Sequence, residues 1–320
     1  MALRGQPRPA PSIDDERRSL LSTEADAQSL ADRLPDLLVE AMRIASTIAH
    51  GIHGRRRPGP GETFWQFRQY ENTDSATLID WRRSASSDHL YVREREWEAA
   101  HTFWLWADLS ASMRFQSDLA AQSKRDRALV LLLATAELLV RGGERVALLG
   151  LTSPTASRRA TTRLAEAIAA NQASPVLRSG LPPAERLSRH CGVVLFGDFL
   201  DPSDDVNERI TALAGSGVSG HLIQVLDPAE ESLPYEGRAE FRGPEGGERW
   251  VADRVESLRE RYVEKLAAHK TAIFDQARHL GWSHLVHHTD RSATDPLLHL
   301  IVRLQNPDAG GLSARAGGVA

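Results

Sequence analysis

Cysteine is nearly absent from this chain. Cys191 is its single cysteine, so no disulfide can form within the 320 residues. Absence of disulfides is typical of proteins from reducing compartments, and we therefore expect a cytoplasmic protein. Cys191 precedes an apolar run and is predicted to be a small buried residue at the start of a strand.

Long hydrophobic runs are also missing. The best apolar stretch, residues 128–140, is interrupted by Glu137 and is shorter than the roughly 20 residues that cross a bilayer. It predicts a buried helix. The first eleven residues contain no apolar core of signal-peptide length, and we expect a disordered lead over 1–24 and a disordered tail over 307–320.

The chain has no excess of positive charge and lacks two motifs of catalysis. Its net charge of -4 and pI near 6.3 give no electrostatic case for binding nucleic acid. A basic run, Arg55 to Arg57, is either a docking patch for an acidic partner or a solvated loop. No phosphate loop and no Gly-x-Ser-x-Gly elbow occurs, which argues against ATP hydrolysis and against a serine hydrolase.

Apolar strands alternate with amphipathic helices from residue 102 onward. Such alternation predicts an α/β fold, an open and mostly parallel sheet covered by helices on both faces, as in Rossmann-like proteins. Residues 240–250 predict a small β-hairpin outside this sheet. The predicted strands are 102–107, 145–151, 192–196, 221–226 and 283–287, and the predicted helices are 125–141, 161–171, 206–215, 252–280 and 294–305.

The region before the sheet has a different pattern. Apolar residues recur at helical spacing over 25–50, although Pro35 interrupts them. We expect the whole segment 25–100 to be a helical and irregular extension that packs on a core domain at 101–306.

Asp108, Ser110 and Ser112 follow the first predicted core strand. In this Asp-x-Ser-x-Ser spacing every second residue is polar, so a turn can direct three oxygens to one point, and oxygen ligands suit Mg²⁺ or Mn²⁺. The alternative is that the same residues cap the next helix. Asp198 follows the strand 192–196, and Gly197 allows a sharp turn toward the first loop.

Several motifs in order resemble a bacterial family, domain of unknown function 58. They are Tyr70 to Asp74, Leu78 to Ser84, His89 to Glu96, Gly197 to Asp201, Val225 to Glu230 and His287 to Arg291. The resemblance spans about residues 50–305 and implies a von Willebrand factor A-like domain.

In that kind of domain the resemblance implies a metal ion-dependent adhesion site that includes Asp108, Ser110, Ser112 and Asp198. The family pattern takes a threonine from a third loop, where this chain offers Ser179 instead. Three residues after another strand compete for that place: Thr152, Ser153 and Thr155. Asp201 is expected to cap the helix that begins beyond Pro202.

The signature segment from Tyr70 to Glu98 is rich in paired charges. We expect Asp80 and Arg82 to have a structural role beside buried Ile79 and Trp81. The partner-binding candidates are Arg93, Glu94, Arg95 and Glu96.

The histidines near the carboxyl end of the chain suggest a zinc site as a further hypothesis. His284, His287 and His288 lie close in sequence to Asp290. Since strand side chains alternate, His284 and His288 share one face and His287 takes the other, which argues against convergence on a metal.

The resemblance implies a non-enzymatic interaction protein that works as an adaptor with a MoxR-type AAA+ ATPase. Mg²⁺ or Mn²⁺ would be its cofactor. The competing hypothesis is a metal-dependent hydrolase that acts through Asp108 and Asp198.

Overall fold

The computed structural model describes residues 13–53, 65–71, 74–95, 100–172, 174–215, 217–243 and 249–305. The chain forms two compact units: residues 49–100 make the smaller one, and 1–48 together with 101–320 make the larger one. Residues 25–48 therefore belong to the larger unit rather than to a common extension with the signature segment. That the signature segment packs on the core stays a prediction.

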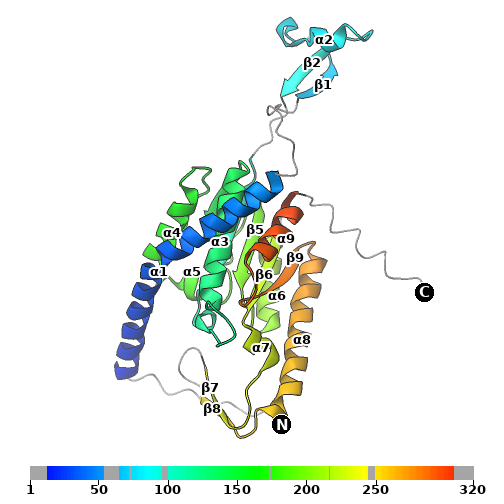
Figure 1. The fold of residues 1–320 in the computed structure, drawn as a ribbon. Helices are drawn as coiled ribbons and strands as arrows, with labels where there is room; N and C mark the ends of the chain where they lie inside the picture. Colours follow the sequence, from blue (N-terminus) through cyan, green and yellow to red (C-terminus); the bar gives the residue numbers. More distant parts are fainter. Residues whose placement is uncertain are drawn as a thin grey trace, which may run out of the picture. The chain divides into compact units, whose positions relative to one another are not determined.

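A five-stranded sheet forms the centre of the larger unit (Figure 1). The strand order is β4-β3-β5-β6-β9, and all four strand pairs are parallel. Beyond edge strand β4 the chain returns through an antiparallel bridge between Val146 and Thr155. The predicted open, mostly parallel sheet is confirmed, with strands β3 (Thr102–Ala107), β4 (Arg145–Leu148), β5 (Gly192–Gly197), β6 (Ser219–Leu226) and β9 (Ser283–His288).

Helices cover both faces of this sheet because successive strand residues point to opposite sides. On one face α3 (Lys124–Arg141) crosses β3 to β6 and contacts α4 (Ala160–Ala170) and α9 (Thr294–Gln305). On the other face α6 (Ser203–Ala214) and α8 (Glu256–His279) pack together. Their core includes Trp106 and Val193 from the sheet and Ile210 and Ile273 from the helices.

Helix α3 is buried almost all round, as the apolar stretch over residues 128–140 predicts despite Glu137. It begins after Ser123, whose hydroxyl accepts from the backbone N–H of Asp126. Glu137 is tolerated in this buried helix because Arg141 and Thr161 both donate to its carboxylate. Among the described residues, no helix has the length and apolar character needed to cross a membrane.

Helix α1 (Ile13–His53) begins inside the segment predicted to be a disordered lead. Residues 13–34 contain no glycine or proline to stop it, and Pro35 lies within the helix. Its apolar stripe, which includes Leu34, Ala41 and Ile48, is buried. Arg33 pairs with Asp126 of α3, so α1 is fixed at the first turn of α3 (Figure 1).

The predicted hairpin is present as β7 (Ala239–Arg242) paired with β8 (Arg249–Ala252) in antiparallel register. Because Ala252 closes β8, helix α8 begins at Glu256 rather than at 252. Short helices α5 (Pro175–Arg178) and α7 (Pro228–Ser232) and the 3-10 turn η2 (Ser112–Arg114) lie in the connections.

In the smaller unit, β1 (Trp65–Gln69) and β2 (Tyr91–Arg95) form an antiparallel pair, connected through the 3-10 turn η1 (Ala76–Leu78) and α2 (Trp81–Ser84). Asp80 accepts from the backbone N–H of Arg83 and caps α2, which agrees with a structural role. Ile79 is buried as expected, but Trp81 is 63% exposed.

Trp81 is therefore not buried within its own unit, which corrects the prediction. The Arg83 guanidinium lies 4.4 Å from the ring centroid of Phe67 and also faces the Tyr91 ring, so arginine covers the apolar surface of the hairpin. The candidate partner surface cannot be placed: the side chains of Arg93, Glu94 and Arg95, all of Glu96, and Arg55 to Arg57 lie outside the described residues.

The histidines of β9 face opposite sides, as strand alternation predicts. His284 contacts Gln224 and His288 contacts Glu231, whereas His287 is buried beside Arg127. Burial, with the charges of Arg127 and His288, lowers the pKa of His287 from 6.5 to about 3.

His287 should therefore make the fold sensitive to acid. Between pH 6.5 and about 3 the unfolded chain binds a proton at His287 that the folded chain does not, so stability falls as pH drops below 6.5. At pH 5 this contribution should be about 2 kcal/mol. Urea unfolding at pH 8 and pH 5 should show a smaller acid loss in His287→Gln, while exposed His279→Gln behaves like wild type. Equal losses in all three proteins would contradict the prediction.

Candidate functional site

The candidate site lies where the strand order reverses. From β3 the chain goes to β4 on one side and later to β5 on the other, so the crossovers diverge at the carboxyl ends of β3 and β5. Open α/β sheets bind ligands at such a point. Asp108 follows β3, Asp198 follows β5, and the Asp108 backbone N–H donates to the carbonyl of Phe196 at 2.8 Å.

Asp108 is completely buried and only partly satisfied. Its Oδ1 accepts from the backbone N–H of Ser110 at 2.7 Å, but its Oδ2 has no hydrogen-bond partner. Burial and then the negative charge of Asp198 raise the pKa of Asp108 from 3.8 to about 7. A buried carboxylate oxygen without a hydrogen-bond partner can still accept a hydrogen bond or bind a cation.

Ser110 and Ser112 connect Asp108 to the second loop. Their hydroxyl oxygens lie 3.0 Å apart, and the Ser112 hydroxyl donates to Oδ2 of Asp198 at 2.8 Å. Neither serine is a helix cap: the residue before η2 is Ala111, which makes no capping bond, and α3 is capped by Ser123. The capping alternative is therefore wrong, and the structure brings together Asp108, Ser110, Ser112 and Asp198.

The close approach of the two loops depends on Gly197. A Cβ atom at this position would lie 3.1 Å from the Cβ of Asp108. Beyond it, Oδ1 of Asp198 accepts from the N–H of Leu200, and the Asp198 carbonyl accepts from the side chain of Gln224 at 2.8 Å. The Asp198 carboxylate is thus held by its own loop, and the Asp198 backbone is held by β6.

Lys124 is the part of the site that sequence reasoning missed. Its ammonium group is completely buried and donates to Oδ2 of Asp198 at 2.8 Å and to Oε1 of Glu230 at 2.5 Å. Burial opposes its charge, but the charges of Asp198 and Glu230 outweigh burial and raise the pKa of Lys124. The lysine therefore stays positive inside the site.

Glu230 is held in place by the start of α7. Asp227 accepts from the N–H of Ala229, and the Glu230 side chain accepts from the N–H of Asp227, which together form a capping box. This box leaves the other Glu230 oxygen for Lys124. The Asp227 to Glu230 spacing was a visible sequence signal for the box, but nothing in it pointed to Lys124.

Ser179 makes no hydrogen bond to Asp108, Ser110, Ser112 or Asp198 among the described residues. It is exposed, and its hydroxyl accepts from the N–H of Leu181 in its own loop. Thr152 and Thr155 accept from the backbone N–H groups of Leu148 and Ser157. The third-loop ligand stays open among these residues and Ser153.

Asp201 does not cap the helix that begins beyond Pro202, which corrects the prediction. The residue that precedes α6 is Pro202, and no side chain caps this helix. Asp201 instead faces the loop of Ser179: a Cβ atom at Gly180 would lie 2.3 Å from its Oδ2. Its charge also contributes to the raised pKa of Asp108, so Asp201 adds a further acid near the site.

The cluster has two properties that matter for a cation. It holds the carboxyl groups of Asp108 and Asp198, which are buried, and of Glu230, which is partly buried, beside the single ammonium group of Lys124. Across the described part of the chain, no group of three or more His, Cys, Asp or Glu side chains is arranged to hold a metal. A metal here would have to use serine hydroxyls or water beside the carboxylates.

Removing the lysine charge should strongly destabilise the fold. Lys124→Met leaves the buried carboxylates of Asp198 and Glu230 without their cation, and loss of one partner from a buried pair costs about 3–5 kcal/mol. Urea unfolding should show this loss, whereas Lys265→Met on the exposed side of α8 should change stability little. A similar small change for both variants would mean that the buried ion pairs do not support the fold.

Comparison with known proteins identifies relatives of unknown activity. Uncharacterized proteins of Mycobacterium bovis and Mycobacterium tuberculosis are 28% identical over 286 residues, which cover 85% of this chain and 89% of theirs. A conserved hypothetical protein, BatB from Bacteroides thetaiotaomicron, matches 65% of this chain and all of its own at 16% identity, with a TM-score of 0.33. A family model described as protein of unknown function DUF58 matches residues 66–272, from the signature segment through the site to α8, and the chain belongs to this family.

Proposed function

We propose that this protein is a non-enzymatic interaction module that binds Mg²⁺ or Mn²⁺ and uses the ion to bind an acidic side chain of a partner. The observation that carries the proposal is that hydrogen bonds link Asp108, Ser110, Ser112 and Asp198 while Oδ2 of Asp108 stays without a partner among the described residues.

The donor set suits a hard divalent cation. It offers carboxylate and hydroxyl oxygens, which Mg²⁺ and Mn²⁺ prefer, and no sulfur or imidazole. Lys124 is the single ammonium group beside the three carboxyl groups of Asp108, Asp198 and Glu230, so a divalent ion would add positive charge where acidic side chains are in excess. Ser179 or water would complete the ligands.

A von Willebrand factor A-like domain is part of the same proposal. Its support is the parallel sheet with an Asp-x-Ser-x-Ser loop after β3 and an aspartate after β5. In such a site the protein supplies few charged ligands, which leaves a coordination position for a carboxylate from outside.

A MoxR-type AAA+ ATPase is the proposed partner, and a cytoplasmic adaptor is the proposed role. Both rest on the family resemblance of the ordered motifs. In support, the chain has no phosphate loop of its own, so a nucleotide-driven cycle would have to come from a partner.

One observation favours the competing hydrolase. A pKa of about 7 is suited to a general base at neutral pH, and Asp108 has that value before any metal binds. Against a hydrolase, the hydroxyl bound to Asp198 is that of Ser112, and Lys124 also occupies this carboxylate. Within the described part of the chain, no histidine is paired with either serine.

The metal proposal predicts weak binding that depends on Asp108. A site with two carboxylates and neutral oxygens should bind Mn²⁺ with a dissociation constant near ~1 mM, equivalent to about 4 kcal/mol. Asp108→Ala should abolish Mn²⁺ relaxation enhancement while the protein stays folded. Exposed Asp118→Ala, which removes the same charge outside the site, should bind like wild type.

Two results would overturn this metal site. One is unchanged Mn²⁺ affinity in folded Asp108→Ala. The other is ester or phosphoester turnover in the wild type that Asp108→Ala removes, which would favour the hydrolase.

The adhesion proposal predicts that partner binding needs the metal and both serines. Ser110→Ala or Ser112→Ala removes an oxygen ligand and should weaken binding to a MoxR-type ATPase by about 1–3 kcal/mol. EDTA should cause the same loss in the wild type and little further loss in the variants. Binding that resists EDTA, with only the melting temperature of the variants lowered, would reject the adhesion mechanism.

A further inference from the structure

A cavity lies where α1, α3 and the start of α9 meet. Its volume is about 310 Å³, at the lower end of the range for small-molecule sites. Four of its lining residues come from α1, and their spacing of three or four residues puts them on one face of that helix. The described lining shares no residue with the candidate metal site. It consists of Glu40, Arg43, Ile44, Thr47, Arg127 and residues 292–294.

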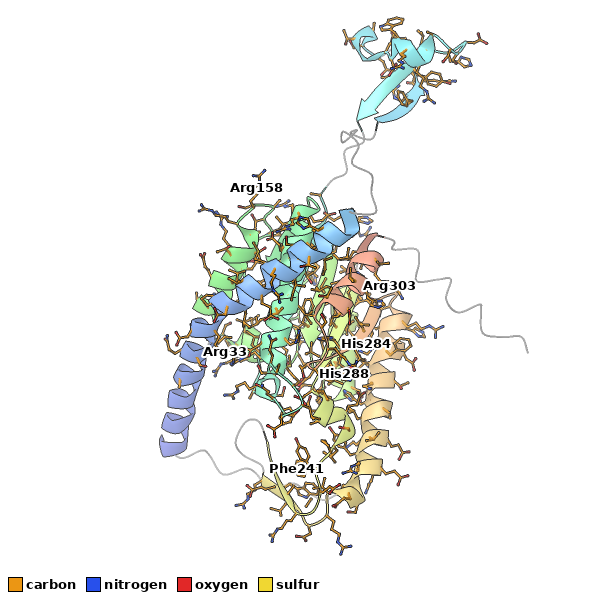
Figure 2. All side chains as sticks on the ribbon, viewed as in Figure 1. Arg33, Arg158, Phe241, His284, His288 and Arg303 are labelled. Carbon is orange, nitrogen blue, oxygen red and sulfur yellow. The ribbon has the colours of Figure 1, made fainter. Side chains whose placement is uncertain are left out.

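The walls of the cavity are held in place by contacts between α1 and α3. Arg33, which Figure 2 labels on α1, pairs with Asp126 of α3. The side-chain amide of Gln122, just before α3, donates to Oε2 of Glu40 at 2.8 Å. The cavity is therefore formed before any ligand binds, which lowers the cost of binding.

Arg127 is a buried cation in this wall. Its side chain is only 8% exposed, its Nη2 donates to the carbonyl of Thr289 at 3.2 Å, and its Nε has no hydrogen-bond partner. Burial lowers the pKa of Arg127, and the charges of Glu40 and Asp290 oppose this only in part. Asp290 pairs with Arg291, and Arg127 forms no ion pair with a described acidic residue. An anion in the cavity would supply the partner that this buried charge lacks.

Arg43 adds a second guanidinium group to the lining. It is exposed, and it too forms no ion pair with an acid in the described part of the chain. The hydroxyl of Ser292 accepts from the N–H of Thr294 at 3.2 Å, so its own proton can be donated to a ligand. Two arginines and a hydroxyl donor are suited to an oxyanion.

Glu40 decides which oxyanion the cavity favours. Its Oε2 accepts from Gln122, and its charge would repel an anion that carries no proton. A phosphate group keeps a proton on part of its molecules near neutral pH, since its second pKa is about 6 in a phosphomonoester, whereas sulfate keeps none. A P–OH group can donate to a carboxylate, so Glu40 turns from a repulsive group into an acceptor.

We propose that this cavity binds a phosphate group that carries a proton, either as inorganic phosphate or on a small phosphomonoester. Arg127 and Arg43 bind its charged oxygens, and Glu40 accepts from its P–OH group. The cavity is larger than one phosphate ion and has room for a small organic substituent.

Calorimetry at pH 6 in the presence of EDTA tests this proposal. EDTA removes divalent metal, so phosphate bound to an ion at Asp108 cannot contribute heat. Inorganic phosphate and glycerol phosphate supply the group from its two sources, and sulfate supplies a tetrahedral anion without the proton. We expect one-to-one binding of at least one phosphate, at least tenfold tighter than sulfate, and the tighter of the two phosphates identifies the source.

Glu40→Gln tests the contact to the proton. Its amide keeps an oxygen that can accept from Gln122 but no longer repels sulfate, so the preference for phosphate over sulfate should fall about tenfold. Asp36→Asn removes an exposed acid from the same helix and should keep the wild-type preference.

Arg43→Gln tests the contact to the charge. Because Arg43 is exposed, the variant should fold like wild type, and loss of its charge-assisted hydrogen bonds should weaken phosphate binding about tenfold. Arg261→Gln, which removes an exposed arginine from α8, should have no effect.

Four results would overturn the proposal. The first two are no saturable binding of either phosphate up to about 10 mM, and equal affinity of the wild type for sulfate and phosphate. The third is an unchanged preference in Glu40→Gln. The fourth is unchanged phosphate affinity in Arg43→Gln, which would place the bound ion outside this cavity.

Discussion

The buried ammonium group of Lys124 is the constraint on which the rest of the site depends. It joins the first turn of α3 to the loop after β5 through Asp198 and to α7 through Glu230. Without it, the loops that carry Asp108 and Asp198 would place like charges together in a volume from which water is excluded. Lys124 allows the acidic side chains to lie close together because its charge offsets theirs. It does not pair with Asp108, whose Oδ2 has no partner among the described residues.

The position of Lys124 is itself fixed from outside the site. Its neighbour Ser123 caps α3, and Asp126 in the same turn pairs with Arg33 of α1. On the far side, Asp227 holds the first turn of α7, and it also accepts from the hydroxyl and N–H of Ser117. The loop between β3 and α3 is thereby held at Ser117 and at its α3 end, which supports the preorganisation that a ligand site requires.

Much of the fold could be predicted from sequence, because the relevant signals are local. Strand β3 was predicted with its observed bounds, since its apolar run ends at a carboxylate. The bounds of α9 were also predicted as observed. The convergence of Asp108 with Asp198 followed from a general rule about the ends of parallel strands. Strand order was not predicted, because neighbouring strands such as β3 and β5 are far apart in sequence and a local pattern does not specify the partner.

Other features escaped because the deciding contact is distant in sequence. Lys124 reads as a solvated residue at a helix start, and only Glu230, 106 residues later, explains its burial. Trp81 reads as core, but Arg83 takes the place over the rings of the hairpin. Asp201 reads as a cap because it precedes a proline, yet it faces Gly180 across the site. A local sequence pattern carries no information on which of these contacts a residue makes in the fold.

The division of the chain into units has a consequence for its covalent layout. Residues 49–100 are an insertion, because α1 before them and β3 after them belong to the same larger unit. Trp65 and Arg95 are paired across the hairpin, so the chain enters and leaves the inserted unit at one end of one ladder. An insertion of this kind stays covalently attached to the larger unit after a single cut on either side of it. Three of the six signature motifs of the family thus lie in the inserted unit, and the other three lie in the larger unit with the residues of the candidate metal site.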